Sequence, residues 1–214
     1  MLREVPTHTF YTILLLICFV AIAIAKRMSH KRFDEFILVI SNSRYLKVYG
    51  KDQKFLDYFD ASLFLNLVIS GAIFCALCFE TLTQTIEINN TLISRIIIGI
   101  SVFFLAKVLL ERLIASLFEI DNIIDNYIFQ KISYKNYLGL FLLPINALLI
   151  FSITPTKTLI YSVLALLFIV NISGLITTCK MYQNEIKNNF FYFILYLCAL
   201  EIAPYVIIYA VFRT

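Results

Sequence analysis

Charged residues are scarce in this chain: they make up 15% of its 214 residues, whereas 61% are hydrophobic. The mean hydropathy is +0.86. A water-soluble domain with this composition would expose too much apolar surface, so an ordinary soluble protein is excluded. Glycine and proline are also few, at five and four residues, and no linker, low-complexity tract or internal repeat divides the chain. The sequence therefore predicts a single integral membrane domain over residues 1–214.

Motifs for catalysis and for metal or phosphate binding are missing as well. The two histidines, His8 and His30, flank the first apolar stretch, so no histidine-based metal cluster is expected. No GxGxxG, GxxxxGK or GxSxG sequence occurs, which removes common nucleotide-binding and serine-nucleophile motifs. The five cysteines are interpreted as small hydrophobes, with redox chemistry at Cys75 and Cys78 as a minor alternative. We expect no catalytic residue, no metal and no cofactor.

Long hydrophobic stretches dominate the sequence. A hydrocarbon core of about 30 Å needs about 20 helical residues at roughly 1.5 Å per residue. Continuous apolar runs favour helices over a barrel, whose strands would alternate in polarity. The stretches that approach this length cover residues 10–25, 61–79, 92–112, 137–152, 158–179 and 190–212. The predicted fold class is all-α, a polytopic membrane bundle of about six transmembrane helices.

The first stretch, 10–25, has a second interpretation as a secretory signal peptide, because Ala23-Ile24-Ala25 is similar to a cleavage site. Signal peptides place positive charge before the apolar run. Here two basic pairs, Lys26-Arg27 and Lys31-Arg32, follow the run instead. An uncleaved helix with its N-terminus outside is therefore favoured.

Lysine and arginine are distributed unevenly over the loops. With the N-terminus outside, all 18 of these residues except Arg3, Arg95, Lys157 and Arg213 lie on the cytoplasmic side. The positive-inside rule relates such an asymmetry to orientation, so we expect both termini outside. The same rule, with anionic lipid, accounts for the basic loop 26–54, and nucleic-acid binding is not expected.

Two segments between the stretches have the pattern of amphipathic helices. The first carries apolar residues at helical spacing, namely Phe33, Phe36, Ile37 and Ile40. The second carries a similar stripe, formed by Leu113, Leu117, Ile120, Ile124 and Tyr127. We interpret both as cytoplasmic helices that lie in the lipid headgroup layer. Docking of another protein is the alternative.

Glu201 lies close to the middle of the last stretch, where an ionised side chain costs about 2.5 to 3.5 kcal/mol on insertion scales. Its carboxyl group must therefore face other helices. Pro204 lies three residues later, and its ring frees backbone carbonyls about one turn earlier. Further polar residues at comparable depth are Asn146, Asn171 and Lys107. Together these five residues form the candidate intramembrane polar site.

Two interpretations of this site stay open. The functional one is a binding position for a proton, an ion or a substrate head group near the bilayer midplane. The structural one is an interhelical hydrogen-bond cluster that locks the bundle. For Lys107, the ordinary structural outcome is a pair with Glu111, one helical turn away.

Two parts of the chain carry a resemblance to a known family. They are the basic loop with KRF at 31–33 and KFLDYFDASL at 54–63, and the C-terminal segment ILYLCALEIAP at 194–204. The chain resembles a family of uncharacterised integral membrane proteins of Bacteroidota-type bacteria, known as a domain of unknown function. The resemblance covers nearly the whole chain and implies a bacterial inner membrane location. It implies no activity and no catalytic residues, and it directs attention to Glu201 and Pro204.

The expected function is that of a non-enzymatic structural or accessory subunit in a larger envelope or secretion-related assembly. Its expected partners are the lipid bilayer and either another membrane protein or a second copy of the chain. A small transporter or proton-coupled permease that uses the Glu201 carboxylate is the alternative. A lipid-modifying membrane enzyme is third, because its best polar set, Asp57, Asp60 and Lys54, is interpreted more easily as a charged helix flank.

Overall fold

The computed structural model describes residues 9–39, 44–50, 57–83, 90–117, 121–153 and 155–181. Every regular element in these ranges is an α-helix. In chain order the helices are α1 (Thr9–Met28), α2 (His30–Ile37), α3 (Arg44–Tyr49), α4 (Tyr58–Thr83), α5 (Asn90–Leu117), α6 (Asp121–Phe151) and α7 (Lys157–Met181). The predicted all-α class is confirmed for this part of the chain.

Five of these helices, α1, α4, α5, α6 and α7, are long and apolar enough to cross a membrane. Four predicted stretches lie inside α1, α4, α5 and α7, which extend them by one to five residues at each end. The fourth stretch, 137–152, covers only the second half of α6, which begins at Asp121. The sixth stretch, 190–212, lies outside the described residues.

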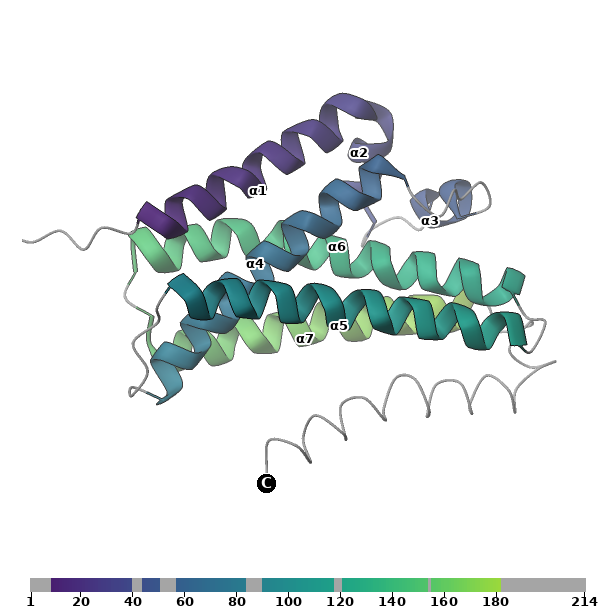
Figure 1. Cartoon of the computed structure of the whole chain (residues 1–214). Coiled ribbons are helices and arrows are strands. Elements are labelled where there is room, and N and C mark those ends of the chain that lie inside the picture. Colours follow the sequence, from purple (N-terminus) through teal and green to yellow (C-terminus); the bar gives the residue numbers. More distant parts are fainter. Residues whose placement is uncertain are drawn as a thin grey trace, which may run out of the picture.

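Helix α4 is the central helix of the described bundle. It packs against α1, α5 and α6, while α7 packs mainly against α6, and Figure 1 shows α4 crossing the other long helices obliquely. More than half of the apolar part of α4 is buried, against about a tenth in α5 and α7. The outer faces of α5 and α7 are therefore apolar and exposed, as expected of helices that face lipid.

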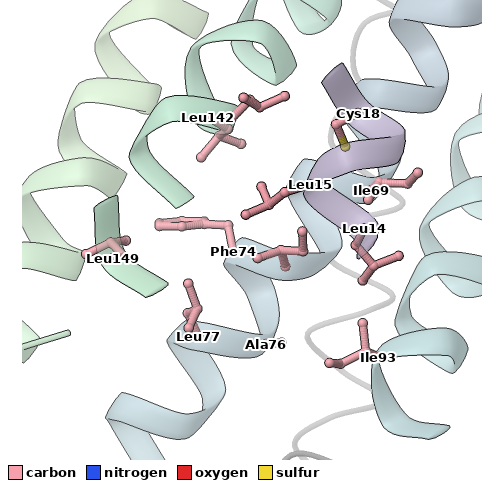
Figure 2. Close-up of a cluster of buried hydrophobic side chains, with 12 residues drawn as sticks. Leu14, Leu15, Cys18, Ile69, Phe74, Ala76, Leu77, Ile93, Leu142 and Leu149 are labelled. Atoms are coloured by element: carbon pink, nitrogen blue, oxygen red, sulfur yellow. The ribbon is translucent and has the colours of Figure 1, made fainter. Parts of the chain in front are cut away.

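One apolar cluster joins α1, α4, α5 and α6. Figure 2 shows Leu15 of α1, Phe74 of α4 and Leu142 of α6 among the side chains gathered between these helices. Cys18 lies in the same cluster and is fully buried, as expected of a small hydrophobe. In a bilayer, where lipid tails are as apolar as these side chains, such a cluster stabilises the bundle through van der Waals packing rather than through exclusion from water.

An aromatic cluster joins α2 and α3 to α4 and α6. Phe33 and Phe36 of α2 are buried in it, and the Phe36 ring makes edge-to-face contacts with Tyr45 at 5.6 Å and Phe59 at 6.0 Å between centroids. The amphipathic helix is thus confirmed as a helix, and these two rings pack on the chain's own helices, whereas Ile37 of the same stripe is exposed. An amphipathic pattern predicts that a face is covered without saying what covers it. Ile40 lies outside the described residues.

The second predicted amphipathic helix is wrong, because its stripe is divided between two helices. Leu113 and Leu117 lie near the end of α5 and are 57% and 72% exposed, whereas Tyr127 is buried on α6. Arg112 Nε donates to Asp125 Oδ1 at 3.0 Å. On one continuous helix these residues would be about 20 Å apart along the axis. The chain therefore reverses direction between α5 and α6.

Candidate functional site

The structure divides the residues of the candidate polar site. Asn146 on α6 and Lys107 on α5 are buried, whereas the side chain of Asn171 is exposed on α7. Glu201 and Pro204 lie outside the described residues. The single site predicted from the sequence is therefore two separate buried groups and one exposed amide in the part of the chain that the structure describes.

The first buried group lies halfway along the bundle. Asn146 Nδ2 donates to the Ser70 carbonyl oxygen of α4 at 2.8 Å. The Ser70 hydroxyl donates to the Asn66 carbonyl oxygen at 2.7 Å, and Cys18 Sγ of α1 lies 3.9 Å from Ser70 Oγ. Cys18 and Ser70 are near the midpoints of Thr9–Met28 and Tyr58–Thr83. Polar contacts therefore join α4 to α1 and α6 near the midpoints of α1 and α4, in keeping with the structural interpretation of Asn146.

The second buried group holds charges between α5 and α6. The Glu111 side chain is fully buried and forms an ion pair with Lys131 of α6. Lys107, itself buried, lies one helical turn from Glu111 on α5. Sequence spacing suggested only Lys107 as a partner for Glu111 and missed Lys131. Lys131 and Asn146 are 15 residues apart on α6, about 22 Å along its axis, so this group is distinct from the mid-length one.

A third buried group surrounds Arg32 of α2. Its carboxylates, Asp57 and Asp60, belong to the polar set considered for a lipid-modifying enzyme, but their pairing with Arg32 was not predicted. The Arg32 guanidinium donates to Asp57, and its Nη2 donates to Asp60 Oδ2 at 2.8 Å. The same guanidinium lies 4.5 Å from the Phe59 ring centroid and 5.3 Å from that of Tyr49. Only 12% of its side chain is exposed. One cation thus links α2 and α3 to the first turn of α4 through ion pairs and cation–π contacts.

The pKa values of Arg32 and Tyr45 both move away from the physiological range. Burial alone would lower the pKa of Arg32, but the neighbouring Tyr45, Asp60 and Asp57 outweigh it, so the pKa is raised. Burial, followed by the Asp60 charge, raises the pKa of the Tyr45 hydroxyl. Arg32 therefore stays cationic and Tyr45 stays neutral at physiological pH. Such a pair suits a fixed link between helices better than a proton carrier.

The spacing of the residues in the Arg32 group was a sequence signal from which shared helix faces could have been predicted. Arg32 and Phe36 are four residues apart on α2 and so share a face, and Asp57 and Asp60 are three residues apart at the start of α4. The positive-inside rule already accounted for Arg32, and Asp57 and Asp60 were interpreted as a charged helix flank, so the sequence did not predict that they pair.

The expectations for metal ligands and cysteines also concern the described ranges. No group of three or more His, Cys, Asp or Glu side chains there is close enough to hold a metal ion. Cys18, Cys75 and Cys78 are free thiols. The chemistry that the described residues do offer is ion pairing and hydrogen bonding between helices.

The family described as a domain of unknown function (DUF4271) matches residues 11–212. The chain belongs to the DUF4271 family. The match includes every residue of the three buried polar groups, from Cys18 to Asn146, as well as Glu201 and Pro204. The predicted kinship with an uncharacterised domain family is thus confirmed. Neither a curated protein nor a solved structure matches this DUF4271 chain.

Proposed function

We propose that this DUF4271 protein is a non-enzymatic accessory subunit of a larger envelope assembly, embedded in a bacterial inner membrane. The observation that carries the proposal is the use of its buried polar groups. Arg32 with Asp57 and Asp60, and Glu111 with Lys131, each join separate helices. Polar side chains that pair with each other between helices have their charges and hydrogen bonds already satisfied, and so they are not available to act on a substrate.

The exposed surface supports the same role. The outer faces of α5 and α7 are mostly apolar, with Leu105, Leu109 and Phe168 among the exposed residues. Such faces can contact lipid or another membrane protein through packing alone. The expected occupants of these faces are the bilayer and a membrane-protein partner or a second copy of the chain.

The orientation that we propose places the N-terminus and C-terminus in the periplasm and the Arg32 group near the cytoplasmic leaflet. It rests on the uneven distribution of Lys and Arg. A reporter fused after Lys47 is therefore expected to behave as cytoplasmic: green fluorescent protein fluoresces there and alkaline phosphatase stays inactive. A fusion at the same position with high phosphatase activity would reverse the proposed topology.

Co-purification tests the accessory role. After extraction in mild detergent, the tagged full-length protein is expected to recover one membrane-protein partner in fixed stoichiometry, or a defined homo-oligomer. A tag on an unrelated membrane protein of similar size is the control. The same purified protein in liposomes is expected to give no proton flux above that of protein-free liposomes.

A small proton-coupled transporter is the second candidate, and the buried Glu111 carboxylate within α5 is the observation that favours it. A monomer with measurable proton flux, lost in Glu111→Gln or Glu201→Gln, would replace the accessory role with this one. Glutamine keeps the size and hydrogen bonding of the side chain but cannot titrate. A monomer with no partner and no flux would leave both candidate functions without support.

A further inference from the structure

Three asparagines on α4 and α6 hold amide atoms that have no hydrogen-bond partner among the described residues. These atoms are Nδ2 of Asn66, both Nδ2 and Oδ1 of Asn136, and Oδ1 of Asn146. All three side chains are 0% exposed. Buried amide groups in proteins are nearly always hydrogen-bonded, and each unmet group in hydrocarbon costs several kcal/mol. A partner for these atoms is therefore expected.

The three asparagines belong to one seam between α4 and α6. At its centre, Gly139 of α6 lies so close to α4 that an added Cβ would be 2.5 Å from Leu67 Cα. Asn66 is the neighbour of Leu67, and Asn136 is three residues before Gly139, about 4.5 Å along the helix axis. Asn146 reaches the same strip of α4 through its 2.8 Å bond to Ser70. We call Asn66, Asn136 and Asn146 the amide seam.

The unmet atoms do not arise from a wrong choice of amide orientation. Exchanging Oδ1 and Nδ2 of Asn136 leaves both atoms unmet, because neither has a partner. Exchanging them in Asn146 would place an oxygen against the Ser70 carbonyl oxygen and lose the 2.8 Å bond. In Asn66 the assigned Oδ1 lies 3.3 Å from Ser70 Oγ, so an exchange would change which amide atom is unmet but would still leave one. The need for an outside partner is thus a property of the seam and not of the assigned hydrogen positions.

The chemistry of the unmet atoms selects the partner. Two are donors, on Asn66 and Asn136, and two are acceptors, on Asn136 and Asn146. An anion would satisfy only the donors, and a metal cation only the acceptors. Water satisfies both kinds, and buried water commonly makes about three bonds to buried polar groups that lack other partners. We propose that the amide seam binds water inside the membrane domain, at one position shared by Asn66 and Asn136 and at another beside Asn146 Oδ1.

Solid-state NMR of the full-length, ¹⁵N-labelled protein in lipid bilayers tests this binding. Magnetisation is transferred from water to nearby N–H groups, and the side-chain amide signals of Asn66 and Asn136 are read. Both are expected to show water cross-peaks. The backbone amides of Ala72 and Ile73, which are equally buried on α4, are the control and are expected to show none. Equal transfer to the asparagines and to these controls would overturn the proposal.

A pair of variants tests whether the water is shared. Asn136→Leu removes both unmet atoms of Asn136 at similar side-chain volume, so the water cross-peak of the Asn66 side chain is expected to be lost. Asn171→Leu removes an exposed amide on α7 and is expected to leave that cross-peak unchanged. An Asn66 cross-peak of full intensity in Asn136→Leu would overturn the sharing. If this variant does not fold, the wild-type cross-peaks of Asn66 and Asn136 still decide whether the seam binds water. That result does not depend on which of the two proposed functions the protein has.

Discussion

Arg32→Met is expected to lower the free energy of unfolding by about 3 kcal/mol, at the lower end of the cost of breaking a buried ion pair. The variant keeps an apolar chain against Phe59 but leaves Asp57 and Asp60 next to each other without their cation. Asp57 is 39% exposed and stays partly hydrated, which is why the lower end of the range applies. Thermal or denaturant unfolding in detergent micelles, followed by circular dichroism, measures the loss.

Matched variants separate the charge of Arg32 from its shape. Lys31→Met removes an exposed cation from the same helix and is expected to change stability by less than about 0.5 kcal/mol. Arg32→Lys keeps the charge but loses the planar fork that binds two carboxylates and stacks on rings, so an intermediate loss is expected. In an Asp57→Asn, Asp60→Asn background, Arg32→Met is expected to cost much less. An undiminished cost in that background would show that the carboxylates are not the reason for it.

The sequence predicted well the helices that consist of one continuous apolar run. Helices α1, α4, α5 and α7 each contain a continuous apolar run, and hydropathy finds such runs directly. The start of α6 was missed because its first half contains charged residues and is not a continuous apolar run. Its first half includes Asp125, which the pattern assigned to a separate amphipathic helix starting near Leu113, and Lys131, which lies between the predicted helices, yet both pair with side chains of α5.

The polar site shows a second limit of the sequence. Asn146 and Asn171 have the same residue type and similar predicted depth, but one is buried against α4 and the other is exposed on α7. Depth along a helix follows from residue number, whereas the face that a neighbouring helix covers depends on crossing geometry. Asn66, which belongs to the amide seam, was not selected because it lies near the start of the stretch 61–79, away from the predicted depth of Glu201.

Gly139 is the position where that crossing geometry is most sensitive to side-chain size. An added Cβ would lie 2.5 Å from Leu67 Cα, 2.8 Å from Leu67 Cβ and 3.0 Å from its nitrogen. Two of these atoms are backbone, so a change of rotamer cannot relieve the overlap and α4 must move away from α6. Gly139→Ala is therefore expected to destabilise the protein by about 2 kcal/mol, within the usual range for overpacking.

Gly71 and Gly99 are the matched controls for this substitution, because nothing lies within 4 Å of a Cβ added at either one. Both are inside helices, where alanine is preferred to glycine by up to about 1 kcal/mol, so Gly71→Ala and Gly99→Ala are expected to be neutral or stabilising. The same unfolding measurement compares all three variants. Because separating α4 from α6 would also stretch the bond from Asn146 to Ser70, Gly139→Ala should perturb the side-chain amide signal of Asn146 and the controls should not. If Gly139→Ala proved as stable as Gly71→Ala, close α4–α6 packing would not be what holds the centre of this bundle together.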